Sequence, residues 1–350
     1  MKNVKKILTV VFSVSFCLFC LISPTDAKAA AAVGINRCIS IIIPSLYAMM
    51  TASLLLMKCG VLSSAGRYIS PITRRIFGMN GEMGVIFLFS LFSGYPVGAK
   101  MIYSMYTEGR LPKKTAELMA GLCFGAGTAF IFGCAASTAE IGRLILASNF
   151  IAEILLAIIL SFYFRKNPIE EKKCKSDISA NILTDSVTSA GKSLGDMCLC
   201  VVVFSVFTKI VEKTGIIHRF AEAFRFSDSI FSAVLDITAI SETSADIPIT
   251  AALISFGGVC VFFQISAIFH GKLSIMPLVM IRTVTAIISY YICRILQPFF
   301  ISEEVTAVFA SSGYMYREVS PIPSIMLILM TGIVIAESAK IKDMSKTNSK

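Results

Sequence analysis

The sequence predicts an all-α polytopic membrane protein, with about eight transmembrane helices and two re-entrant or broken helical hairpins in an inverted repeat. The mean hydropathy is +0.77. Only 15% of the residues are charged, whereas soluble domains carry about 25%. The apolar residues form continuous blocks close to the roughly 20 residues that a helix needs to cross a bilayer. Continuous rather than alternating blocks argue against a transmembrane barrel, and the composition excludes a disordered chain, a secreted disulfide scaffold and a coiled coil.

The basic residues between the apolar blocks indicate how the chain crosses the membrane, because Lys and Arg prefer cytoplasmic loops. If every block crosses once, the basic stretches 63–82 and 107–117 fall on opposite sides. If 83–104 and 230–247 each enter and leave on one side, every basic cluster becomes cytoplasmic, and we prefer this topology. The candidate segments are 7–23, 41–62, 83–104, 118–137, 141–164, 197–217, 230–247, 248–269, 275–296 and 322–339.

The first thirty residues have the layout of a secretory signal peptide. Three lysines precede an apolar core, and Ala27-Lys28-Ala29 supplies a small-residue cleavage site. An uncleaved first helix with a cytoplasmic N-terminus fits the same residues, and we favour it.

Eight of the other segments form two sets, and each set has the order span, hairpin, span, span. The first set is 41–62, 83–104, 118–137 and 141–164, and the second is 197–217, 230–247, 248–269 and 275–296. Because the second set starts on the opposite side of the membrane, the pattern is the inverted repeat of secondary transporters, whose sites lie at the midplane between broken helices. The predicted units are a signal-like first helix (1–29), a first repeat (30–164), a cytoplasmic linker (165–196), a second, inverted repeat (197–296), and an outer segment with a last helix and basic cytoplasmic tail (297–350).

The first hairpin carries the most informative stretch of the chain. Proline and glycine break a helix at its middle, and a broken helix offers an N-terminus that favours anions. Lys100 meets a polar ligand or pairs with a carboxylate of the other hairpin; alternatively, the glycines only permit packing and Lys100 snorkels to the surface. The candidate substrate-binding residues here are Ser93, Gly94, Tyr95, Pro96, Gly98 and Lys100.

The second hairpin supplies Asp236, Thr238, Glu242 and, from the segment after it, Gln264 as candidate substrate-binding residues. A carboxylate at the centre of a lipid-facing helix costs about 2.5–3.5 kcal/mol, so an ionisable group here indicates a functional site. The alternative is that two of these residues face water at the mouth of the hairpin.

Further polar and small residues leave two interpretations open. Phe124–Thr128 and Ser255–Gly258 fit close helix packing, or helix unwinding that exposes carbonyls. Asn149 and Glu153 share a helix face that suits an interhelical hydrogen bond. Arg282 lies where it could neutralise either Asp236 or Glu153, and the sequence does not choose between them.

No enzyme is predicted, because the sequence has no catalytic Ser/His/Asp set, metal-ligating cluster or nucleotide-binding loop. Most of the 11 cysteines lie inside apolar runs as small hydrophobic residues. We expect no catalytic residues, metal or cofactor, and the coupling ion is undetermined. The net charge of +10 comes from loops and indicates contact with the lipid bilayer rather than with nucleic acid.

The chain resembles the sporulation integral membrane proteins of the Gate-domain, or nucleoside-recognition, family over about residues 30–295. It departs from the family pattern at Asp236, where Glu is usual, at Ala239-Ile240, where Asn-Gly is usual, and at Phe124-Gly125, where an Asn pair is usual. The residues that carry the resemblance are Ile43–Leu46, Phe92–Lys100, Tyr106–Leu111, Leu235–Thr238, Ser255–Cys260 and Gln264–Ser266.

The resemblance implies a cell-membrane protein of a spore-forming bacterium, needed for spore cortex formation, with a transporter-like core that binds a small polar solute of nucleoside-like type. Both termini are expected in the cytoplasm, and a second copy or other sporulation membrane proteins are the expected partners. The alternative is a membrane scaffold for spore-envelope assembly that transports nothing.

Overall fold

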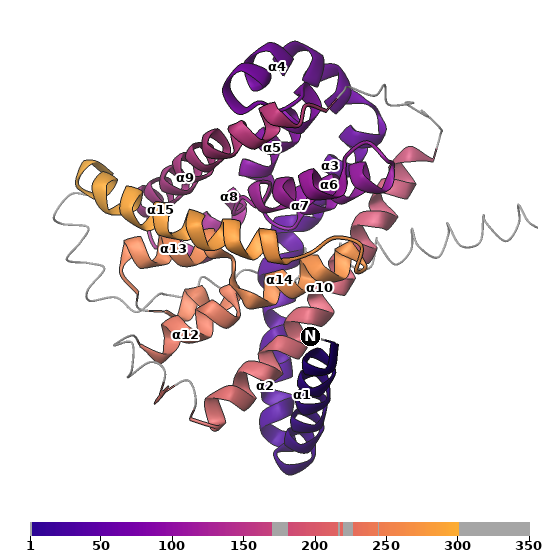
Figure 1. Ribbon diagram of the computed structural model, residues 1–350. Coiled ribbons are helices and arrows are strands. Elements are labelled where there is room, and N and C mark those ends of the chain that lie inside the picture. The colour runs from indigo at the N-terminus through magenta and orange to yellow at the C-terminus, as the bar shows by residue number, and fades with distance from the viewer. Residues whose placement is uncertain (1, 170–180, 216–217, 220–226, 244, 301–350) are drawn as a thin grey trace, which may run out of the picture.

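The computed structural model describes residues 2–169, 181–215, 218–219, 227–243 and 245–300 (Figure 1). All regular elements in these ranges are helical, as predicted. The predicted last helix, 322–339, lies outside the described residues. The elements are α1 (Lys2–Ile22), α2 (Pro24–Arg37), η1 (Cys38–Ile42), α3 (Ile43–Lys58), α4 (Val61–Phe77), α5 (Gly81–Ser93), α6 (Val97–Thr107), α7 (Lys113–Leu122), α8 (Thr128–Phe130), η2 (Ile131–Ala135), α9 (Ala139–Lys166), α10 (Ile182–Lys213), α12 (Asp228–Leu235), η3 (Ile237–Glu242), α13 (Ile247–Phe256), α14 (Gly258–Phe269) and α15 (Met276–Phe300).

Five helical stretches in the described residues are long and apolar enough to cross a membrane, which is the signature of an integral membrane protein. Helices α4 and α5 together are also long and apolar enough to cross a membrane, but they are bent by 83° relative to each other. The number of eight spans therefore stays a prediction. The five stretches are Pro24–Lys58, Ala139–Lys166, Ile182–Lys213, Ile247–Phe269 and Met276–Phe300.

Several helix boundaries differ from those that the apolar blocks indicate. One 35-residue helical stretch, Pro24–Lys58, runs through the predicted boundary at residue 29 and contains Ala27-Lys28-Ala29. Helix α10 begins at Ile182, inside the predicted linker, because Ser186, Ala190 and Ser193 form a small, buried face at helical spacing.

The basic stretch 63–82 is also largely helical. Helix α4 buries Leu62, Gly66, Thr73 and Phe77 on one face and carries arginines on the rest. Hydropathy alone misses such an amphipathic helix, because its polar face lowers the mean over the whole segment.

The predicted first hairpin turns back on itself. Helix α5 ends at Ser93, and α6 begins at Val97. Near the turn, a Cβ on Gly98 would lie 2.8 Å from the Cβ of Ser90, although eight residues of continuous helix would separate them by about 12 Å. At the open end, Arg110 forms an ion pair with Glu82. The stretches before and after the hairpin therefore lie on the same side of the fold.

The predicted second hairpin turns back as well. After α12 the chain makes a short 3₁₀ helix, η3, and the hydroxyl of Thr243 donates a hydrogen bond to the carbonyl of Ser229 over 3.3 Å. A continuous helix would hold these residues about 21 Å apart. The inverted relation of the two hairpins in a membrane stays a prediction.

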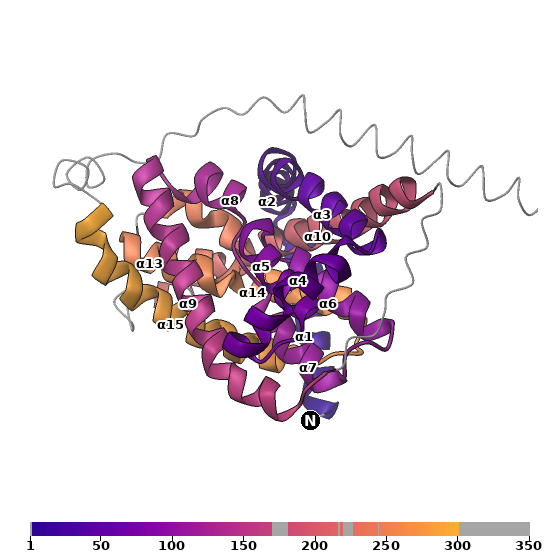
Figure 2. The same ribbon diagram turned by 90° about the horizontal axis from the view of Figure 1, so that it is seen from above.

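Long helices frame the two hairpins. Helix α10 packs against both α2 and α3, and α15 lies beside α9 in both views (Figures 1 and 2). The hairpin turns thus lie inside the bundle rather than at its surface.

The α4–α5 bend depends on a backbone contact that only glycine allows. A Cβ on Gly81 would collide with the carbonyl of Gly66. We expect Gly81→Ala to destabilise the folded protein by about 1–3 kcal/mol, as overpacking does. Thermal unfolding in detergent tests this, with Gly195→Ala as the control, because a Cβ on Gly195 meets nothing within 4 Å. Equal unfolding temperatures for the two variants would contradict the packing account.

Candidate binding site between the helix breaks

Three helix breaks meet at the centre of the described bundle. A Cβ on Gly94, at the first hairpin's turn, would lie 2.9 Å from the Cα of Gly127 in the α7–α8 break. Gly257, between α13 and α14, packs against the ring of Phe124. Gly94 and Gly257 have φ values of +83° and +86°, which residues other than glycine rarely adopt.

The predicted alternative of helix unwinding is therefore correct at both glycine-rich stretches. Helix α7 ends at Leu122, and residues 124–127 are not helical. The apolar block 118–137 is consequently not one continuous helix. Unwinding leaves the last carbonyls of α7 and α13 without their usual partners within the helix.

Arg282 of α15 binds those carbonyls. Its side chain is fully buried. It donates hydrogen bonds to the carbonyl oxygen of Ser255 (2.9 Å from Nε) and to that of Gly121 (3.4 Å from Nη1). Its guanidinium also lies 4.8 Å from the centroid of the Phe124 ring. One cation thus serves the C-terminal ends of two broken helices, where the helix dipole favours positive charge.

Glu153 of α9 neutralises this arginine. Its Oε1 accepts hydrogen bonds of 3.4 Å from both Nη1 and Nη2 of Arg282. Of the two partners that the sequence left open for Arg282, the structure selects Glu153 rather than Asp236. One turn away, the hydroxyl of Ser289 donates to Asn149 Oδ1 over 2.6 Å, so the predicted interhelical hydrogen bond at Asn149 is confirmed.

A small cavity of about 30 Å³ lies where the two hairpins meet. It has room for about one water molecule. Four of the predicted site residues line it together, namely Tyr95 from the first hairpin, Asp236 and Thr238 from the second, and Gln264 from α14. We call this space the inner cavity.

The inner cavity contains polar groups that the protein does not satisfy. The hydroxyls of Tyr95 and Thr238 are buried and make no hydrogen bond within the described part of the chain. The hydroxyl of Ser93, just before the first turn, is also buried and has no hydrogen bond to the described residues. Most buried polar side-chain atoms in proteins have a partner, so three such hydroxyls near one cavity indicate a place for a bound polar molecule.

Asp236 lies at the end of α12 and is only 2% exposed. Its Oδ1 accepts a hydrogen bond of 3.0 Å from the backbone amide of Thr238. Asp236 thereby caps the N-terminus of η3. Its Oδ2 lies 3.5 Å from Nη1 of Arg37. The predicted carboxylate is thus buried and paired, rather than facing open water.

The other predicted site residues whose side chains are described do not line the inner cavity. Gly98 packs against the carbonyl of Cys123. Pro96 follows Tyr95 through a cis peptide bond. Lys100 is half-buried and interacts electrostatically with Asp196 of α10, so among the described contacts it is not the partner of a carboxylate of the second hairpin. The side chain of Glu242 lies outside what the structure describes.

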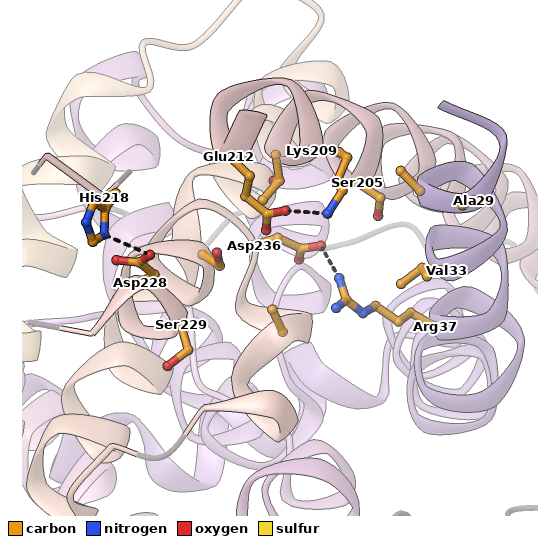
Figure 3. Close-up of a pocket in the computed structure, with 14 residues that line it drawn as sticks. Ala29, Val33, Arg37, Ser205, Lys209, Glu212, His218, Asp228, Ser229 and Asp236 are labelled. Carbon is orange, nitrogen blue, oxygen red and sulfur yellow. Dashed lines mark hydrogen bonds and ion pairs between the residues drawn. The ribbon is translucent and has the colours of Figure 1, made fainter. Parts of the chain in front are cut away.

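A larger pocket of about 580 Å³ lies beside the inner cavity (Figure 3). Helix α10 contributes Ser205, Thr208, Lys209 and Glu212, whose spacing places them on one helix face. Helices α2 and α12 supply the other walls, and Asp236 lines both this pocket and the inner cavity. We call this larger space the outer pocket.

Arg37 was not predicted as a site residue, and the outer pocket that it lines was therefore not predicted either. The signal for it was a single arginine inside the 35-residue apolar stretch Pro24–Lys58. A charge in such a place is costly unless it is paired, so it points to a buried partner.

Among the described residues, no group of three or more His, Cys, Asp or Glu is placed to hold a metal ion. No protein-family model, curated protein or solved structure matches this chain.

A substitution of Arg282 tests whether this residue stabilises the C-terminal ends of α7 and α13. We expect Arg282→Met to destabilise the protein by about 3–5 kcal/mol, because it leaves Glu153 buried without its cation. Thermal unfolding in detergent measures the effect. Arg294→Met on the exposed face of the same helix is the control. An equally small change in both variants would show that Arg282 does not hold the broken helices.

Proposed function

We propose that this chain is a transporter-like membrane protein that binds a small polar solute at the inner cavity between its two hairpins. The observation that carries the proposal is the set of buried hydroxyls without partners, on Ser93, Tyr95 and Thr238, where the helix breaks meet. A buried hydroxyl without a hydrogen bond costs about 1–3 kcal/mol, so these groups lower the stability of the protein alone. A bound solute that supplies partners would recover that free energy, and because the inner cavity has room for about one water molecule, the solute enters only when the hairpins move apart.

Helix breaks support the same proposal. Non-helical backbone at membrane depth is tolerated where protein covers it or where it lines a wet cavity. Here Arg282 covers the carbonyl ends of α7 and α13. The hairpin turns at Tyr95 and Asp236 instead line the inner cavity. The fold therefore separates a closed structural centre from an adjoining polar space.

The role in spore cortex formation and the nucleoside-like solute rest on the family resemblance alone, and both are part of this proposal. The competing function is a scaffold for spore-envelope assembly. The two functions differ in what they require: a solute site needs the hairpin residues, whereas a scaffold needs the charged stretches between the apolar blocks, such as the basic one within 165–196.

The unpartnered hydroxyls give a test that separates function from stability. We expect Tyr95→Phe and Thr238→Val to leave the unfolding temperature unchanged or raised, because each removes a hydroxyl that the protein does not satisfy. We also expect both to lower the number of heat-resistant spores formed by a host strain that carries only the variant gene. Tyr291→Phe and Thr283→Val, at exposed positions of α15, are the matched controls. Full spore formation by both cavity variants would contradict a solute site at these hydroxyls.

The charged candidates give a second test. We expect Asp236→Ala and Lys100→Ala to abolish spore formation, although both proteins still accumulate in the membrane, because a transport cycle needs both hairpins. Immunoblots of membrane fractions check accumulation. Wild-type spore counts in both variants, together with loss of function when the lysines at 172, 173 and 175 are replaced by serine, would favour the scaffold.

A further inference from the structure

The outer pocket contains three acid–base pairs (Figure 3). It adjoins the inner cavity, because Asp236 lines both spaces. Lys209 Nζ lies 2.9 Å from Glu212 Oε2, and His218 Nδ1 lies 3.4 Å from Asp228 Oδ2. The third pair is Arg37 with Asp236. Its volume of about 580 Å³ falls in the range of about 300–1,000 Å³ that small-molecule sites occupy.

The Arg37–Asp236 pair differs from the other two in its burial and its place. The side chains of Arg37 and Asp236 are 11% and 2% exposed, whereas those of His218 and Asp228 are 65% and 58% exposed. Asp236 lines both spaces, and Arg37 lines only the outer pocket. The pair therefore lies at the boundary between the outer pocket and the inner cavity.

Close helix packing sets the position of Arg37. A Cβ on Gly34, one turn before it, would lie 2.7 Å from Ser205 Oγ and 2.9 Å from Val202 Cα of α10. Glycine at this position lets α2 approach α10 closely enough for Arg37 to reach across the pocket toward α12. On the facing wall, the hydroxyl of Thr208 is buried and makes no hydrogen bond within the described residues.

We infer that the outer pocket is the entrance to the inner cavity, that the Arg37–Asp236 ion pair is its gate, and that a small zwitterionic solute opens it. Breaking the pair without replacing either partner would leave a carboxylate and a guanidinium buried and uncompensated. A zwitterion replaces both: its cationic group binds Asp236 and its anionic group binds Arg37. A solute with one charge replaces only one partner.

This inference rests on the proposed solute site for what lies behind the gate. The gate itself can be tested without a solute, through the reactivity of single cysteines in the full-length protein after the native cysteines are replaced. Ser232→Cys reports on the outer pocket, because Ser232 lines it and is partly exposed, and Thr238→Cys reports on the inner cavity. The probe is a small cationic methanethiosulfonate reagent.

We expect Ser232→Cys to react readily and Thr238→Cys to react slowly. Adding Arg37→Gln should raise the rate at Thr238→Cys about tenfold or more, because the rate follows the fraction of molecules whose gate is open. The double change Arg37→Gln with Asp236→Asn should have the same effect and leaves no buried unpaired charge, so it separates gate opening from misfolding. Lys209→Gln, which breaks another pair in the same pocket, is the control.

Equal rates at Thr238→Cys with and without Arg37→Gln would overturn the gate. A rise of the same size in Lys209→Gln would also overturn it, because it would mean that the whole pocket loosens.

The class of solute is tested in the same protein. A mixture of α-amino acids should slow the labelling of Ser232→Cys, whereas their N-acetyl derivatives and their amides, each with one charge less, should not. Protection by either derivative set, or by none of the three, would overturn the zwitterion. If the labelling rates change as expected but host strains that carry Tyr95→Phe or Thr238→Val form spores normally, the gate is supported and the proposed solute site is contradicted.

Discussion

The architecture depends on the burial of one cation among the ends of broken helices. Arg282 binds backbone carbonyls of Ser255 and Gly121 and the carboxylate of Glu153, and it lies over the ring of Phe124. Without such a group, two helix C-termini would be left with unsatisfied carbonyls inside an apolar bundle. A guanidinium suits the place because its five donors spread in a planar fork that reaches several acceptors at once.

Two kinds of polar group therefore lie side by side in the described core. Around Arg282 the guanidinium donors are paired, which fixes where α7 and α13 end, although Glu153 Oε2 and Asn149 Nδ2 have no hydrogen bond among the described residues. At Tyr95 and Thr238 the hydroxyls have no partner among the described residues. This division fits a protein in which one half of the centre holds the fold and the other half is left to a ligand. Close backbone contacts at Gly94 and Gly257 bring the two halves together.

The helical class, both chain reversals and four of the residues that line the inner cavity were predictable from sequence, because glycine, proline and carboxylates interrupt apolar blocks that would otherwise form continuous helices. The partner of Arg282 was not, since Asp236 and Glu153 both lie far from it along the chain, where no local rule applies. The partner of Lys100 was also left open, because a helix position does not say which neighbour a long side chain meets. Arg37 was missed because it lies between the predicted segments 7–23 and 41–62, where an arginine needs no buried partner. Amphipathic α4 was missed because its burial is confined to one face.

The most direct test of the account is the membrane side of three exposed residues, which decides whether the two hairpins enter from opposite faces. Tyr68 is 85% exposed on α4, and the side chains of Glu108 and Asp228 are 43% and 58% exposed. Single cysteines at these positions would be labelled in intact cells with a reagent that does not cross the membrane. The account predicts that position 228 reacts from outside, whereas 68 and 108 react only after the cells are opened. Labelling of all three from the same side would contradict it.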